Sequence, residues 1–221
     1  PMCATFTPSQ NQPWVQARFG VSLPTQSHPA QAYPGYEAPM VVKSRQNGRV
    51  ACGLARFGLI PAWAKDDKIG RRTYNARAET VASKPSYREA WKQSRFGIVP
   101  VDAFFEPAYV GGKAQRWRIS LANHEPLGIA CIWENWLNPL TGARVTSFSM
   151  LTVNADAHPV MRQFHAPDDE KRTPVILHPD QFNAWLDAEP TQAAAMMHWQ
   201  LMPSLVAHPP NEPPPIQSTQ P

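Results

Sequence analysis

A cysteine stands at position 3 of the 221-residue chain, within the opening stretch PMCATF. If processing made Cys3 the first residue, it would carry a thiol together with an α-amine, whose pKa is about 7.7–8.0. Such a residue can attack as a nucleophile with its own amine as the base. The amine can also condense with an aldehyde to a Schiff base, which the thiol closes to a thiazolidine ring. Simpler interpretations are a small hydrophobic residue at the start of an edge strand, since CATFT alternates, or a surface thiol.

A second group of polar side chains lies in RRTYNARAET, residues 71–80, which is too polar for a buried strand. Its candidate residues are Arg71, Arg72, Asn75 and Arg77. Arginine side chains bind phosphate groups, and nearby Trp63 could add an aromatic face on which a base would stack. From composition alone, a solvated loop leading into a helix is the commoner explanation of such a stretch.

A glutamate and a histidine are the candidates for proton transfer. Glu106 ends the β-type run GIVPVDAFFEP, and the aromatic residues beside it would raise its pKa by excluding water. His165 lies in the polar loop MRQFHAPDDEKR just before the strand-like segment VIL, where an acid–base residue could act. A glutamate at the rim in a salt bridge and a surface histidine are the commoner roles of these residue types. The sequence alone therefore leaves both interpretations open.

Composition favours an ordinary globular protein. Hydrophobic residues make up 43% of the chain, and the net charge of +4 with a pI of about 9.1 is a mild basic excess, compatible with a polyanionic partner. The three cysteines form no CxxC pair, so we expect neither a disulfide framework nor a metal site, and no cofactor is required. No apolar leader or long apolar run is visible, which predicts a cytoplasmic protein without a membrane segment. No heptad repeat requires assembly, so we expect a monomer.

Short β-type runs outnumber helices, and they do not alternate with helices as in βαβ units. The expected strands are residues 50–57, 96–101, 116–121, 127–133 and 147–153, with turns at 110–113 (VGGK) and 137–144 (LNPLTGAR). One helix is expected from a Ser86 cap to residue 94, a second from an Asp180 cap up to Pro190, and a third over residues 191–200. This pattern predicts an α+β fold built on largely antiparallel sheet.

Proline is the unusual component, with 25 residues. Seven of them lie in the last stretch, PSLVAHPPNEPPPIQSTQP, which lacks hydrophobic periodicity and predicts an extended, disordered tail. We place one folded domain at residues 2–208 and the proline-rich tail at residues 209–221.

Four stretches taken together resemble one protein family. MCATF, FGLIPAWAKD with YNARAET, VPVDAFFEP, and the His165 loop leading into TPVIL follow in the order seen in the SOS response-associated peptidase (SRAP) family. The similarity spans residues 2–201. The resemblance implies a single barrel-like domain with a few short helices that removes its own initiator methionine by cysteine peptidase-type chemistry. It also implies a DNA-repair function: the exposed cysteine forms a thiazolidine crosslink with an abasic site in single-stranded DNA and protects that site, in the cytoplasm or at the nucleoid.

The resemblance further implies roles for individual residues. The catalytic group that carries over consists of Cys3, Asn75, Glu106 and His165. In the family the asparagine positions the cysteine and the abasic sugar, the glutamate shuttles protons, and the histidine assists ring opening or closure. Arg77 and Trp63 match positions at which the family contacts DNA, and the neighbouring Arg71 and Arg72, as phosphate-binding arginines, complete the expected DNA-binding group. Neither a metal nor an organic cofactor takes part.

The chain departs from the family pattern close to the nucleophile. Ala4 and Thr5 stand where the family has glycine and arginine, and Pro107 stands where a tryptophan commonly follows the glutamate. The acidic residues 168–170 would repel DNA if they face it. Two alternatives to crosslinking therefore stay open: a cysteine peptidase that acts on other proteins, and a catalytically inactive nucleic-acid-binding module.

Overall fold

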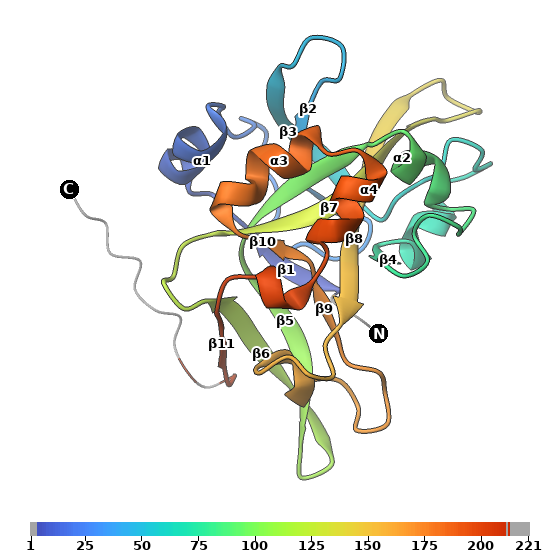
Figure 1. The fold of residues 1–221 in the computed structure, drawn as a ribbon. Coiled ribbons are helices and arrows are strands. Elements are labelled where there is room, and N and C mark those ends of the chain that lie inside the picture. The colour runs from blue at the N-terminus through green and yellow to red at the C-terminus, as the bar shows by residue number, and fades with distance from the viewer. Residues whose placement is uncertain (1–3, 211, 213–221) are drawn as a thin grey trace.

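The computed structural model describes residues 4–210 and residue 212, and eleven strands dominate it (Figure 1). The strands are β1 (Thr5–Pro8), β2 (Glu37–Lys43), β3 (Val50–Phe57), β4 (Asn75–Arg77), β5 (Phe96–Val110), β6 (Lys113–Leu121), β7 (Leu127–Leu137), β8 (Arg144–Asn154), β9 (Arg172–Pro174), β10 (Ile176–Leu177) and β11 (Leu205–His208). The α-helices are α1 (Gln12–Phe19), α2 (Arg88–Lys92), α3 (Phe182–Asp187) and α4 (Pro190–Met196). Short 3₁₀ turns lie between them, among them η1 (Lys68–Arg72) and η3 (Pro179–Gln181).

Five of the strands close on themselves as a barrel. The hydrogen-bonded order runs from β5 to β7, β8, β3 and β2, and β2 pairs with β5 again. Every pairing in this ring is antiparallel except β3 with β8. The α+β class and the largely antiparallel, barrel-like sheet expected from the sequence are therefore confirmed.

Side chains alternate between the two faces of the barrel strands, as the period of a β-strand requires. On β5 and β7, Val99 and Ile129 belong to the cluster that fills the barrel, together with the rings of Phe57 and Phe148. The residues next along each strand point outward and meet the aromatic side chains of the helices. Figure 1 shows α3 and α4 lying across this outer face. On α3, the indole N–H of Trp185 donates to a backbone carbonyl of β5, 2.9 Å away.

The long strand β5 carries the functional region beyond the barrel. It pairs with β2 and β7 inside the ring, and farther along with β1 and β6. The register of β1 places Thr5 opposite Phe105, and the register of β6 places Trp117 opposite Glu106. The start of the described chain is thereby fixed beside the carboxyl-terminal half of β5.

The five strands expected from the sequence are all present, and four of them are longer than expected. Both turns are confirmed: β5 ends at Val110 and β6 begins at Lys113, and β7 and β8 flank residues 138–143. At the first turn Gly111 and Gly112 have φ of 57° and 77°, a left-handed conformation that glycine adopts at little cost. Strands β2 and β4 and helix α1 were not predicted.

Two of the three predicted helix starts were wrong, whereas the helix expected over residues 191–200 is present as α4. Helix α2 begins after Tyr87 with no side-chain cap, so Ser86 does not cap it. Asp180 lies within the 3₁₀ turn η3, and α3 starts two residues later. Pro190 is the first residue of α4, a position where the missing N–H of proline costs nothing.

Strand β11 lies inside the proline-rich stretch, where we expected no strand. Leu205–His208 pairs antiparallel with β6, because an edge strand offers free backbone groups whatever the composition of its partner. Most of the tail predicted at residues 209–221 lies outside the described residues. Within the described part of the chain, no helix is both long and apolar enough to span a membrane.

Gly58 is required where β3 meets η1. Its φ is +118°, and a Cβ atom there would lie 2.2 Å from the carbonyl oxygen of Gly70. We expect Gly58→Ala to lower the free energy of unfolding by more than about 2 kcal/mol, since both the backbone and the space exclude a side chain. Gly53→Ala is the control, because no atom lies within 4 Å of its Cβ position. Equal denaturation midpoints for the two variants would contradict this account.

Candidate active site

Glu106 is a carboxylic acid enclosed by the sheet. It lies on β5 opposite Trp117 of β6, and only 2% of the residue is exposed. Alternation along β5 directs this side chain inward between Phe105 and Pro107, which are half-buried. Removal from water raises the pKa of Glu106 well above its ordinary value. Burial therefore favours the neutral, protonated form of this acid, which can give up a proton.

His165 faces this acid from the loop after β8. Its backbone N–H donates to the carbonyl oxygen of Pro107 at 2.8 Å, which ties the loop to β5 one residue beyond Glu106. Its φ of +65° is unusual for a residue with a side chain, and the surrounding contacts hold it. The ring nitrogen Nε2 lies 3.2 Å from the carbonyl oxygen of Arg172. A carbonyl only accepts, so Nε2 carries the proton and Nδ1 keeps its lone pair.

That lone pair points toward Glu106. Nδ1 of His165 lies 3.7 Å from Oε2 of Glu106, and the two side chains are 5% and 2% exposed. Burial lowers the pKa of His165 below its ordinary value, while burial raises that of Glu106. Burial therefore favours a neutral imidazole and a neutral carboxylic acid over an ion pair. Such a pair can pass a proton to a reacting atom and take it back.

A cavity of about 280 Å³ adjoins the acid where the described chain begins. Ala4, Thr5 and Glu106 are among the residues that line it. Continuing the register of β1 and β5 by one residue brings Ala4 opposite Glu106. Cys3, the expected nucleophile, lies outside the described residues.

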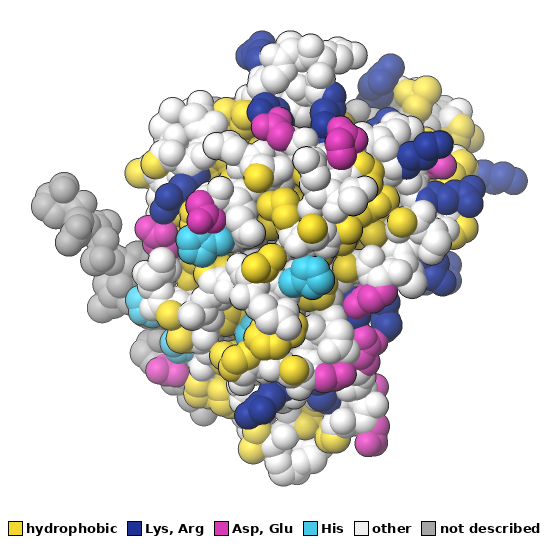
Figure 2. All heavy atoms as spheres, viewed as in Figure 1, with side chains coloured by type: hydrophobic (Ala, Val, Ile, Leu, Met, Phe, Trp, Pro, Cys, Tyr) yellow, Lys and Arg dark blue, Asp and Glu magenta, His cyan; other side chains and the backbone are white. Residues whose placement is uncertain are grey.

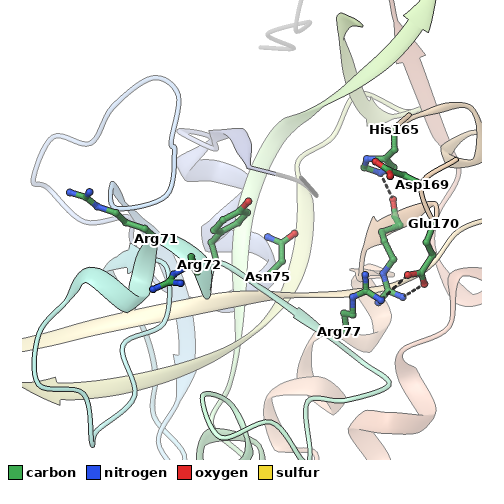
Figure 3. A pocket seen from close by; sticks show the side chains of 9 residues that line it. Arg71, Arg72, Asn75, Arg77, His165, Asp169 and Glu170 are labelled. Carbon is green, nitrogen blue, oxygen red and sulfur yellow. Dashed lines mark hydrogen bonds and ion pairs between the residues drawn. The ribbon is translucent and has the colours of Figure 1, made fainter. Parts of the chain in front are cut away.

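A second cavity, of about 430 Å³, contains most of the expected DNA-binding residues (Figure 3). The side chains around it are Arg71, Arg72, Tyr74, Asn75, Arg77, His165, Asp169, Glu170 and Arg172. In Figure 3, Asn75 lies between the two arginines of η1 and the loop that carries His165. The acid–imidazole pair therefore joins the two cavities, because Glu106 lines the smaller one and His165 the larger one.

The strands and turns that hold these residues explain their placement. Asn75 is buried on β4, which pairs in parallel with β8, and its carbonyl oxygen accepts a hydrogen bond from the Tyr87 hydroxyl at 2.9 Å. Arg71 and Arg72 are exposed at the end of η1, which Thr73 anchors through its hydroxyl to the carbonyl of Leu59 at 2.6 Å.

Trp63 is not among the residues that line either cavity. It is 58% exposed, and its indole N–H lies 3.3 Å from the carbonyl oxygen of Pro85. The structure thus brings together Arg71, Arg72, Asn75, Arg77, Glu106 and His165, and leaves Trp63 outside the cavities.

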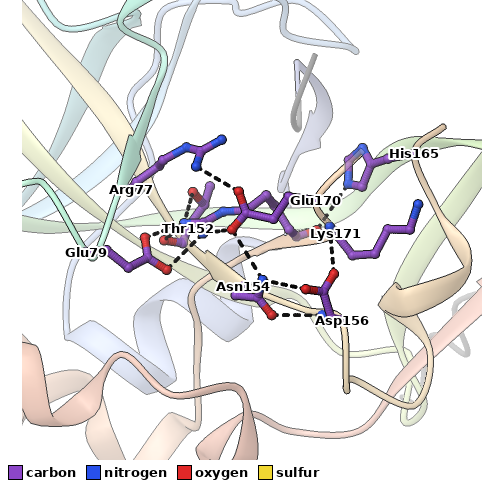
Figure 4. A network of polar contacts seen from close by, with 9 residues as sticks. Arg77, Glu79, Thr152, Asn154, Asp156, His165, Glu170 and Lys171 are labelled. Atoms are coloured by element: carbon purple, nitrogen blue, oxygen red, sulfur yellow. Dashed lines mark hydrogen bonds and ion pairs between the residues drawn. The ribbon is translucent and has the colours of Figure 1, made fainter. Parts of the chain in front are cut away.

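Sequence reasoning missed Arg172. This arginine is 2% exposed, and its guanidinium donates to both carboxylate oxygens of Glu79, to Glu170 and to Thr152 (Figure 4). Burial alone would lower the pKa of Arg172, but the two carboxylates outweigh burial and raise it. Its carbonyl oxygen also orients His165. The signal in the sequence was an arginine directly before a strand-like segment, a place where a charge must be paired.

The two described cysteines are poor nucleophiles. Burial raises the pKa of Cys52 to about 11 and that of Cys131 further, so both remain thiols near neutral pH. Among the residues that the structure describes, no three or more His, Cys, Asp or Glu side chains lie close enough together to hold a metal ion.

The fold and this site define a barrel protein with a buried acid–imidazole pair beside a cavity lined by arginines. The sequence pattern of the SOS response associated peptidase (SRAP) family matches residues 2–210. A crystal structure of a Bordetella bronchiseptica protein is similar to the chain, with a TM-score of 0.83 and 30% identity, and covers 94% of this chain and 99% of that one. The chain belongs to the SRAP family.

Relatives with names are also found. The abasic site processing protein YoqW of Bacillus subtilis is 31% identical over 195 residues, which are 86% of this chain and 82% of that protein. The abasic site processing protein HMCES of Gallus gallus is 28% identical over 154 residues, 60% of this chain and 44% of that protein. A Bacteroides thetaiotaomicron structure shares the fold, with a TM-score of 0.76 at 22% identity, and covers 94% of this chain and 91% of that one.

The raised pKa of Glu106 predicts a dependence of stability on pH. As the pH rises above 4.5, the unfolded chain releases a proton that the folded chain retains, so stability falls until the folded pKa is passed. Glu106→Gln lacks this loss. We therefore compare the free energy of unfolding of Glu106→Gln with that of the wild type. We expect this difference to favour the variant more at pH 7 than at pH 4, by about 1.4 kcal/mol for each unit by which folding raises the pKa of Glu106 within this range.

Urea denaturation at several pH values measures this difference. Glu89→Gln, which changes an exposed glutamate of α2, is the matched control and should show no such gain. A difference between Glu106→Gln and the wild type that stays constant across this range would mean that Glu106 is ionised in the folded protein.

Proposed function

We propose that this chain processes abasic sites in DNA, and that it does so by forming a thiazolidine crosslink between Cys3 and an abasic site in single-stranded DNA. The observation that carries the proposal is the buried Glu106–His165 pair between the cavity lined by Ala4 and the cavity lined by arginines. Position 3 is one peptide bond from Ala4. The relatives named abasic site processing proteins support the same substrate.

Two reactions follow one another in this proposal. Hydrolysis of the Met2–Cys3 peptide bond consumes one water and frees the α-amine of Cys3, as in a cysteine autopeptidase. The amine then attacks the aldehyde of the ring-opened abasic sugar, and loss of one water gives a Schiff base. The thiol sulfur adds to the carbon of the C=N bond, and its proton passes to the nitrogen. Both Schiff base formation and the addition of the thiol need an acid that gives and regains a proton.

Glu106 supplies that proton in our proposal, because burial keeps its carboxyl group protonated. The lone pair on Nδ1 of His165 can accept the proton that the attacking amine loses, while Glu106 is ionised. Asn75 is buried and lines the cavity with the arginines, where its side-chain amide could orient the sugar. Reversal of the same steps would release the DNA with its abasic site intact. A lyase-like activity would instead be β-elimination from the Schiff base, which breaks the bond to the 3′ phosphate oxygen.

Arg71, Arg72 and Arg77 would bind the phosphates on either side of the sugar. Trp63, exposed outside the cavities, would offer a surface on which a neighbouring base stacks. A single strand suits such a site, since its sugar can turn into the cavity without unpairing a duplex. All these groups come from one chain, so a monomer suffices, and DNA binding would place it at the nucleoid.

The test is incubation of the protein, with Cys3 as its first residue, with single-stranded DNA that contains one abasic site. We expect an adduct that survives denaturation, whose mass equals protein plus DNA minus one water. Cys3→Ser should abolish this thiazolidine. Cys52→Ser is the matched control and should form the adduct at the wild-type rate, because the Cys52 thiol is held protonated by burial.

Failure of the wild type to form the adduct would contradict the proposal. If the wild type then cleaved unrelated peptides, the site would be that of a peptidase acting on other proteins. Binding to single-stranded DNA without any reaction would instead mark an inactive nucleic-acid-binding module.

A further inference from the structure

The loop after His165 brings negative charge to the cavity that would bind DNA. Asp169 and Glu170 line the cavity together with Arg71, Arg72 and Arg77. In Figure 2, Asp and Glu side chains gather below the Lys and Arg side chains along the right edge of the view. A phosphate-binding cavity with carboxylates in its wall requires an explanation, since like charges repel.

Glu170 is held firmly in this position by hydrogen bonds. Its Oε1 accepts from Nη1 of Arg172 at 2.8 Å and from Nδ2 of Asn154 at 3.2 Å. Arg172 is itself buried and is fixed by Glu79 through two hydrogen bonds of 2.8 Å (Figure 4). The hydrogen bond from Arg172 lowers the pKa of Glu170. The carboxylate is therefore an ionised group with a fixed place rather than a mobile surface charge.

The other oxygen of the Glu170 carboxylate is bound to Arg77, a residue that is expected to bind DNA phosphate. Oε2 of Glu170 accepts from Nη1 of Arg77 at 2.7 Å, and the two side chains are 35% and 48% exposed. Carboxylate and phosphate oxygens bind to the same N–H groups of a guanidinium with similar geometry. Glu170 thus occupies the place on Arg77 that a DNA phosphate would take.

We propose that Glu170 competes with DNA phosphate for Arg77 and thereby weakens the binding of undamaged single-stranded DNA. This inference rests on the proposed function for the identity of the polyanion. A strand without an abasic site must displace the carboxylate or do without Arg77, so it dissociates readily. An abasic strand is retained by the covalent bond to Cys3 instead. Glu170 is in this sense a specificity-determining residue, because only DNA that reacts with Cys3 is retained.

Glu170→Gln tests the competition. The variant keeps an oxygen that can accept from Arg172 and removes the charge that attracts Arg77. We expect it to bind a fluorescent oligothymidylate without abasic sites about two- to tenfold more tightly than the wild type. Its slope of log K against log salt concentration should steepen by about 0.7, as expected for one additional phosphate contact on a single strand.

Asp168→Asn is the matched control. It removes the same charge from the same loop, but Asp168 does not line the cavity. We expect it to change the affinity much less than Glu170→Gln does. In an Arg77→Ala background, the gain from Glu170→Gln should disappear, because the competition acts through that guanidinium.

Equal affinities of Glu170→Gln and Asp168→Asn would overturn the inference while leaving adduct formation at abasic sites untouched. A gain for Glu170→Gln that persists without Arg77 would overturn it as well. If the gain depends on Arg77 but no adduct forms with abasic DNA, the competition stands and the proposed crosslinking fails. Absence of oligothymidylate binding by both the wild type and Glu170→Gln would overturn the inference, and adduct formation with abasic DNA would still decide the proposed crosslinking separately.

Discussion

The carboxyl group of Glu106 lies 3.7 Å from the imidazole of His165, and both side chains are almost fully buried. Ionising either group there costs more free energy than in water, so burial favours the neutral form of both groups. The other features of the site serve this contact. Strand β5 extends past the barrel to carry the acid, and Pro107 of the same strand binds the backbone of His165. Arg172 fixes the tautomer of the imidazole through its carbonyl oxygen.

A network of charged side chains lies beside the acid–imidazole pair. Arg172 is buried and paired with Glu79 and Glu170, and this network holds the strand β9 that orients His165 (Figure 4). Glu170 links the network to Arg77 at the cavity wall. The Glu170 carboxylate therefore both supports the acid–imidazole pair and, in our proposal, controls anion binding by Arg77. A change in this loop would alter both, unless the replacement keeps the hydrogen bond to Arg172.

Sequence patterns predicted four of the five barrel strands, all but β2, and the family resemblance predicted which polar stretches meet. The runs at residues 50–57 and 147–153 are short and bounded by turn residues, as strands are, and both form strands. Helix starts failed at Ser86 and Asp180, since tertiary packing rather than capping decides where such short helices begin. Contacts between distant segments, such as Arg172 with Glu79, leave no local pattern, so the network could not be predicted from sequence.

The protonation state of Glu106 tests the account most directly. Infrared difference spectra of the wild type against Glu106→Gln, recorded at pH 7, report the C=O stretch of a protonated carboxylic acid apart from the bands of a carboxylate. We predict a protonated-acid band that is present in the wild type and absent from the variant, because burial raises the pKa of Glu106. A difference spectrum that contains only carboxylate bands would mean that Glu106 is ionised at neutral pH and cannot act as the acid.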